Sequence, residues 1–183
     1  MRDVLERATD YQRTYAIVGR GHYLAAERLA RLNRWLGIPV VVITAVVGTT
    51  IFGTINQQNV PTHWKILAGM VSLIGAVLSS LQTSLGFAQA AEQHKAVASR
   101  YRAIKRRLEL FALKYSGTET NQRSEAIADL ENLNKELTEL ASESPNLPDI
   151  CYDRAAREYD SDEVKLSRAV LDSAPNAVGR SAG

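Results

Sequence analysis

The chain has 183 residues, of which 45% are hydrophobic, and its 22 lysines and arginines nearly balance its 20 aspartates and glutamates. These averages are those of an ordinary soluble domain, but the apolar residues concentrate in two blocks, 36–55 and 66–87, that contain no charged residue and no histidine. The composition therefore excludes a purely soluble protein and leaves little length for a separate enzyme domain. The single cysteine, Cys151, excludes an internal disulfide framework and a cysteine-rich metal site.

Residues 1–35 are predicted to form an amphipathic helix, the first arm. Its apolar positions recur at spacings of four and three residues, which is typical of a coiled-coil seam. The seam consists of Val4, Ala8, Tyr11, Tyr15, Val18, His22, Ala25, Leu29, Leu32 and Leu36. Pro39 lacks an N–H group, so together with Gly37 it predicts a break or bend between this arm and the first apolar block. The Gly-Arg-Gly run at 19–21 lacks the third glycine of a dinucleotide-binding loop and is interpreted as a flexible spot in the helix.

The blocks 36–55 and 66–87 are predicted to be two transmembrane helices joined by a short outer loop, 56–65. At about 1.5 Å per residue, helices of 20 and 22 residues reach roughly the 30 Å thickness of a bilayer's hydrocarbon core. Seven basic residues lie in the first arm and seven in 92–115, whereas the loop carries only Lys65. By the positive-inside rule, both termini are expected in the cytoplasm.

Small and polar side chains recur along one side of the second span, and two interpretations stay open. The simpler one is close packing of helices, within the hairpin or between copies of it. The other is that the polar residues line an aqueous path, which requires an oligomer because two helices cannot enclose a pore. The candidate residues for either role are Ser72, Ser79, Ser80, Gln82 and Thr83. The spans carry no ring of charged residues, so strong charge selectivity is not expected.

Residues 88–116 are predicted to form the second arm, a basic helix with its own apolar seam. The seam consists of His94, Val97, Tyr101, Ile104, Leu108, Phe111 and Tyr115. If the two arms zip together antiparallel, within one chain or between chains, His22 and His94 approach each other and Tyr101 can join the same layer. We interpret these three residues as an arm interface rather than as a catalytic or metal site.

The second arm also carries a dense basic cluster. Anionic lipid headgroups attract such residues close to a membrane, which is the simpler interpretation. The alternative is a groove for an anionic ligand, for example a nucleotide whose phosphates accept bidentate hydrogen bonds from arginine. The cluster consists of Arg100, Arg102, Lys105, Arg106 and Arg107.

The C-terminal part of the chain is acidic. Residues 1–117 hold 15 basic and six acidic side chains, but residues 118–183 hold seven basic and 14 acidic ones. An amphipathic helix is predicted for 118–142, with apolar positions at helical spacing. The polar segment 143–183 has two prolines near its start, Pro145 and Pro148, which mark a linker. It is predicted to be weakly helical over about 149–172 and disordered from Ser173. The acidic helix can pair with the basic arms or present a solvated face.

These patterns predict an all-α membrane protein: a two-helix transmembrane hairpin continued by long amphipathic, coiled-coil-like cytoplasmic helices. No alternating β pattern appears outside the apolar blocks. The three histidines, His22, His63 and His94, are not spaced as metal ligands, and no catalytic or phosphate-binding motif occurs. We therefore expect neither an enzyme nor a cofactor or metal site, and no nucleic-acid partner.

A basic arm, a two-span hairpin and the helix that leaves the membrane resemble the SLATT family, the SMODS and SLOG-associating two-transmembrane effectors. The most telling piece is the helix segment HKAVASRYRAIKRRL at 94–108, preceded by Ala90-Ala91-Glu92. The similarity covers about residues 5–142.

The resemblance implies a membrane effector of a prokaryotic conflict or anti-phage system. Such a protein would form a homo-oligomer in the lipid bilayer of the inner membrane and permeabilise it. Its signal would be a nucleotide second messenger or a nucleotide-sensing partner protein. The alternative is a non-conducting membrane scaffold that recruits a soluble partner through its cytoplasmic helices.

Overall fold

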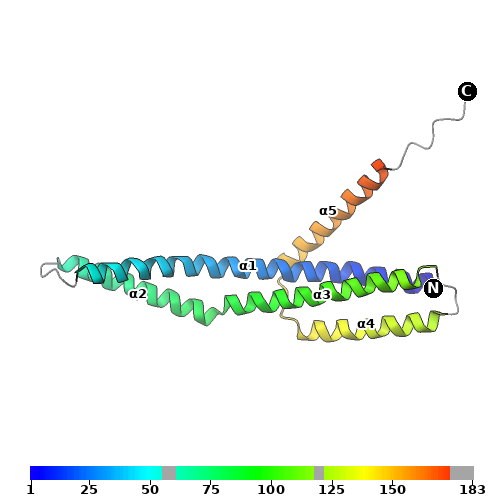
Figure 1. Ribbon diagram of the computed structural model, residues 1–183, viewed down its shortest axis with the longest axis horizontal. Helices are drawn as coiled ribbons and strands as arrows, with labels where there is room; N and C mark the ends of the chain where they lie inside the picture. Colours follow the sequence, from blue (N-terminus) through cyan, green and yellow to red (C-terminus); the bar gives the residue numbers. More distant parts are fainter. Residues whose placement is uncertain (55–60, 118–121, 174–183) are drawn as a thin grey trace, which may run out of the picture. The chain divides into compact units, whose positions relative to one another are not determined.

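The computed structural model describes residues 1–54, 61–117 and 122–173. Over these residues the chain forms helices and no strand (Figure 1). In chain order they are α1 (Arg2–Thr54), α2 (Thr62–Leu85), α3 (Phe87–Tyr115), α4 (Arg123–Glu143) and α5 (Asp149–Ser173). The prediction of an all-α chain with two long apolar helices is therefore confirmed.

The helices divide into two compact units, and each is described by itself. The span unit comprises Ala26–Gln93, and it holds the second half of α1 together with α2. The arm unit comprises Met1–Ala25 and His94–Gly183, and it holds the start of α1, most of α3, and α4 and α5.

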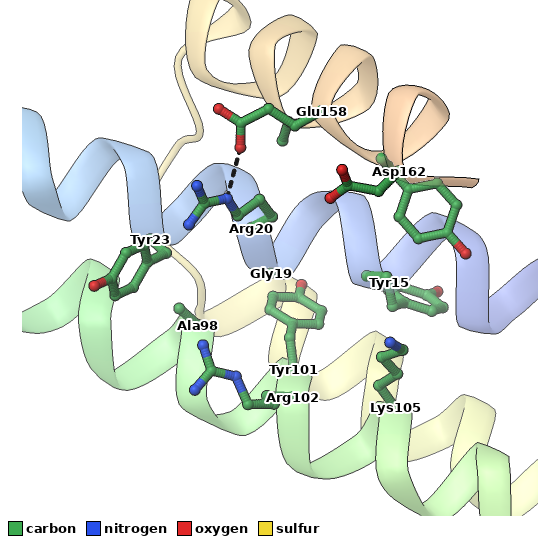
Figure 2. Close-up of a pocket in the computed structure, with 13 residues that line it drawn as sticks. Tyr15, Gly19, Arg20, Tyr23, Ala98, Tyr101, Arg102, Lys105, Glu158 and Asp162 are labelled. Atoms are coloured by element: carbon green, nitrogen blue, oxygen red, sulfur yellow. Dashed lines mark hydrogen bonds and ion pairs between the residues drawn. The ribbon is translucent and has the colours of Figure 1, made fainter. Parts of the chain in front are cut away.

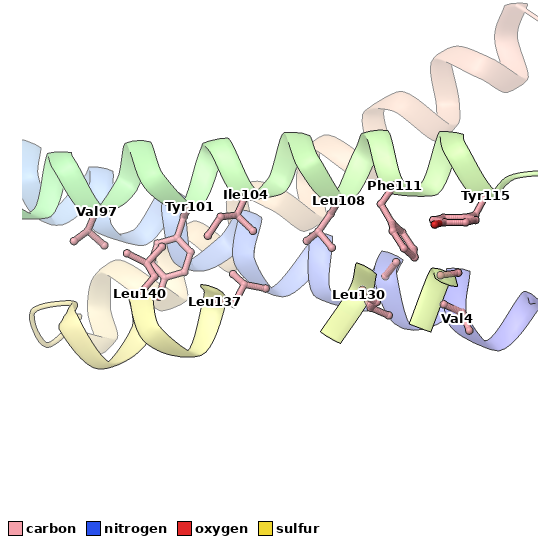
Figure 3. Packing of buried hydrophobic residues seen from close by; sticks show 12 residues of the cluster. Val4, Val97, Tyr101, Ile104, Leu108, Phe111, Tyr115, Leu130, Leu137 and Leu140 are labelled. Atoms are coloured by element: carbon pink, nitrogen blue, oxygen red, sulfur yellow. The ribbon is translucent and has the colours of Figure 1, made fainter. Parts of the chain in front are cut away.

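The arm unit has a core built on one face of α3. Six buried residues of α3 recur at spacings of four and three, so they share one face of the helix. They are Val97, Tyr101, Ile104, Leu108, Phe111 and Tyr115. Figure 3 shows these side chains on the same side of α3, where residues of α4 and the start of α1 also lie. The partners in this cluster are Val4 and Ala8 of α1 and Ala126, Leu130, Leu137 and Leu140 of α4.

Helix α5 docks on α1 through a second, smaller cluster. Cys151 and Ala155 are buried with Ile17, Leu24 and Ala25. Because these are few and mostly small residues, much less apolar area holds α5 than holds α4.

Ion pairs join the acidic α4 to the basic α3. Arg100 bonds Glu143 at 2.8 Å, and Arg107 bonds Glu136 at 2.6 Å. Lys114 contacts both Glu125 and Asp129 at 3.1 Å. These side chains are largely exposed, so each pair adds little stability, but together they favour one alignment of the two helices.

In the span unit, α1 continues as a helix through Pro39, so a break between the first arm and the first span is wrong, and the alternative of a bend stays a prediction. Proline removes one backbone hydrogen bond, but in an apolar segment the other backbone groups find partners only within the helix, which favours keeping it intact.

The chain breaks instead after the second span. Helix α2 ends at Leu85, Gly86 takes a left-handed conformation with φ 57°, and α3 begins at Phe87. Glycine adopts this conformation without the steric cost of a Cβ atom, so it can end one helix and start the next.

Two predicted boundaries also shift. Helix α2 starts at Thr62, directly after Pro61, so the last four residues of the predicted loop 56–65 are helical. Helix α5 includes Ser173, where disorder was predicted to begin. Residues 55–60, 118–121 and 174–183 lie outside the described residues, and the predictions made for them stay predictions.

Replacing Leu108 with alanine should destabilise the arm unit, because Leu108 is 0% exposed in the α3 core. Leu→Ala changes at such sites cost about 2–5 kcal/mol, since a cavity remains. The matched control is Leu110→Ala on the same helix, where the side chain is 65% exposed. The free energy of unfolding of the full chain in detergent, followed by circular dichroism, should fall for the first variant only.

Candidate functional site

Two buried histidines meet in the arm unit. The Nδ1 atoms of His22 on α1 and His94 on α3 lie 2.9 Å apart, and the side chains are 2% and 6% exposed. One ring must donate its proton while the other accepts, so the two neutral rings carry different tautomers. Tyr101 stacks on His22 at a centroid distance of 5.8 Å, and Tyr15 stacks on Tyr101 at 5.8 Å. The three predicted interface residues are thus in one layer within a single chain.

Burial keeps this pair neutral. Burial, with a smaller contribution from the neighbouring His94, lowers the pKa of His22 to about 4. Burial also lowers the pKa of His94. A histidine in the unfolded chain binds its proton near pH 6.5, so between about pH 6.5 and 4 the unfolded state holds more protons than the folded state.

The five residues of the predicted basic cluster do not form one site. Arg100 and Arg107 are paired with α4, as described above. Lys105 contacts Glu109 on its own helix at 3.5 Å. Arg102 and Arg106 form no ion pair with any described residue. Arg102 and Lys105 line a cavity between α1, α3 and α5, whereas Arg107 lines a separate groove between α3 and α4.

This cavity, about 440 Å³ in volume, lies between α1, α3 and α5 of the arm unit (Figure 2). Its basic and acidic side chains come from different helices, which form opposite walls of the cavity. Arg102 and Lys105 come from α3, whereas Glu158 and Asp162 come from α5, and Figure 2 shows the two sets on opposite sides. Arg20 of α1 lies between them and bonds Glu158 at 2.8 Å, which holds the pKa of that carboxyl below its usual range. The remaining lining residues are Tyr15, Ala16, Gly19, Tyr23, Ala98, Tyr101, Ala155 and Tyr159.

Sequence reasoning missed this cavity because α5 had been set apart as a weakly helical tail. It also misjudged the Gly-Arg-Gly run. A Cβ atom on Gly19 would lie 3.0 Å from Tyr101 Cβ, and one on Gly21 would lie 2.9 Å from Leu147 Cδ2. The two glycines are therefore points of close helix packing rather than a flexible spot. Gly21 and Ala25, small residues four apart that both contact the Leu147–Ala155 region, were the available signal for this packing.

The polar residues of the second span lie in the span unit. Ser72 donates to the Ala68 carbonyl at 2.8 Å, and Thr83 donates to the Ser79 carbonyl at 3.1 Å. Each hydroxyl is thus satisfied within its own helix, as expected at membrane depth. Ser72, Ser79, Ser80 and Thr83 are all exposed in the single chain.

The two spans approach closely at Gly75, where an added Cβ atom would lie 3.2 Å from the Ile43 side chain. Ser72 and Ser79 line a groove of about 400 Å³ beside this contact. Gln82 is half-buried and donates from Nε2 to Asn33 Oδ1 at 3.4 Å. The five candidate residues therefore divide between the groove, the Asn33 contact and the exposed face.

No group of three His, Cys, Asp or Glu side chains is arranged to hold a metal ion within residues 1–54, 61–117 and 122–173. Cys151 is buried against α1 and has no disulfide partner.

The histidine pair predicts that acid weakens the arm unit. The free energy of unfolding should fall by about 2 kcal/mol for His22 alone between pH 7 and 5, because its pKa rises from about 4 to 6.5 on unfolding. His22→Gln should reduce the dependence of the free energy of unfolding on pH over this range. His63→Gln, a histidine outside the arm unit, is the control and should leave it unchanged. Equal slopes in all three proteins, measured by thermal unfolding over this range, would contradict the assignment.

The comparisons with known proteins identify the domain. The family model for SMODS and SLOG-associating 2TM effector domain family 4 matches residues 13–167. No curated protein and no solved structure matches the chain. The match extends past residue 142 and includes most of α5, in agreement with the docking of α5 in the arm unit. The two long apolar helices agree with the two transmembrane segments in the family's description. The chain belongs to SMODS and SLOG-associating 2TM effector domain family 4, and its family and helices mark it as a membrane effector of conflict systems.

Proposed function

We propose that several copies of this protein assemble in the inner membrane and permeabilise it when a nucleotide or a partner protein signals to the arm unit. The observation that carries the proposal is the surface of the span unit, where large apolar side chains point outward along both helices. Such a surface is unfavourable in water and favourable in lipid. The most exposed of these residues are Trp35, Ile38 and Val41 on α1 and Ile66, Met70 and Leu73 on α2.

The need for several copies follows from geometry. Two helices cannot surround an aqueous path, so a path needs hairpins from neighbouring chains. The exposed hydroxyls of α2 are suited to face such neighbours, because polar groups at membrane depth face protein or water rather than lipid.

The basic residues support an orientation with the arm unit in the cytoplasm. Lysines and arginines flank the hairpin on the side of the two arms. A soluble signal made inside the cell would then reach the arm unit directly. It can shift the assembly only if it binds the permeable state more tightly than the closed one.

The test is leak of ions and dye from proteoliposomes that contain the purified full chain. Ser80→Leu should remove the leak, because Ser80 is exposed on α2 and lies outside the groove between the spans. Ile74→Leu, an exposed position six residues before Ser80 and therefore about 120° around α2 from it, is the control and should leak like the natural chain.

Gln82→Leu gives a second variant at the Asn33 contact. Leak that persists in both Ser80→Leu and Gln82→Leu would contradict a path along α2. If the natural chain never leaks yet still acts in cells, the protein is instead a scaffold that recruits a soluble partner through its helices.

A further inference from the structure

We propose that the cavity between α1, α3 and α5 binds a small ligand that joins an aromatic ring to a phosphate, as a nucleoside monophosphate does. The inference deepens the proposed function and rests on it for the idea that a soluble signal acts on the arm unit. Three features of the cavity carry it: its rings, its basic wall and its acidic wall.

The rings supply stacking surfaces. Four tyrosines line the cavity, one pair of which, Tyr15 and Tyr101, is already stacked nearly parallel at 5.8 Å with an interplanar angle of 12°. Tyr23 has the Arg20 guanidinium 5.4 Å from its ring centroid. Tyr159, on α5, lines the same cavity. An aromatic base can stack on these rings, and the volume of a nucleoside monophosphate suits a cavity of this size.

The α3 wall supplies the anion contacts. Arg102 forms no ion pair with a described residue, and the Lys105 contact to Glu109 is long, at 3.5 Å. The neighbouring Arg100 and Arg107 are instead engaged by carboxylates of α4. A phosphate in the cavity would therefore find its donors in Arg102 and Lys105, with the bidentate geometry that arginine offers.

The α5 wall selects against a bare anion. Glu158 accepts from Arg20 and Arg154, and Asp162 accepts from Lys165. Each ionised carboxylate has further lone pairs, so both can also accept from the hydroxyl or amino groups of a ligand, but neither can donate to a phosphate. Since the two walls carry opposite charges, the ligand needs an anionic end toward α3 and a donor end toward α5. A nucleoside monophosphate has both, with the ring between them.

A bound ligand would also hold α5 in place. Helix α5 is attached by the small cluster around Ala155 and by exposed ion pairs, Arg20 with Glu158 at 2.8 Å and Arg13 with Asp160 at 2.9 Å. A molecule that touches α3 and α5 together adds to this attachment. Ligand binding should therefore slow amide hydrogen exchange along α5.

The experiment is calorimetric titration of the full chain, in detergent micelles, with the monophosphates of adenosine, guanosine, cytidine and uridine. Adenosine, inorganic phosphate and glycerol phosphate are the comparison ligands. At least one nucleotide should bind saturably and protect α5, whereas the comparison ligands should bind more weakly. Arg102→Gln should weaken nucleotide binding by about tenfold or more, the loss of a charged hydrogen bond.

Arg106→Gln is the matched control, because Arg106 lies one turn further along α3 and outside the cavity. It should bind the nucleotide as the natural chain does, and the circular dichroism spectra of both variants should match. The proposal is overturned if none of the four nucleotides saturates the chain or if Arg102→Gln binds unchanged. Equal weakening by Arg106→Gln, or equal binding of glycerol phosphate, also overturns it, because the anion would then be held by a diffuse basic surface or a lipid-headgroup site.

The titration and the leak assay test the two proposals separately. Nucleotide binding that depends on Arg102 supports the cavity even where proteoliposomes do not leak. Leak without such binding supports the proposed function and overturns the cavity.

Discussion

The apolar face of α3 is the contact on which the arm unit depends. Helix α4 and the start of α1 both pack against it, and the same face carries Tyr101 to the histidine layer. Because the six buried residues repeat at spacings of four and three, a shift of α3 by one residue would turn charged side chains toward its partners. The ion pairs between α3 and α4 reinforce this alignment from the outside, where water weakens each of them.

Periodicity made the helices and the histidine layer predictable. The seams of the two arms have the spacing of facing helices, and antiparallel pairing brings His22 to His94, as the 2.9 Å contact now shows. The basic cluster could not be resolved in this way. Which arginines meet carboxylates of α4 depends on the exact rotation of each side chain around α3, and composition does not record it.

The errors have physical causes as well. Proline was expected to break α1 because it lacks an N–H group, yet a single lost hydrogen bond is not enough to end a helix whose neighbours stay bonded. Gly86 gave a weaker signal in the sequence, since glycine inside an apolar run is common in membrane helices, and only its backbone angle marks the break. Helix α5 was undervalued because its buried side is narrow and composed of small residues such as Ala155, which score poorly in any apolar pattern.

The histidine contact has one further consequence. Both rings present the same atom, Nδ1, to each other, so the hydrogen bond has no inherent direction: either ring can be the donor. Selection therefore acts on the pair and not on either position alone. Related chains can place a permanent donor at one position provided that the other keeps an acceptor, and the two positions should vary together across the family.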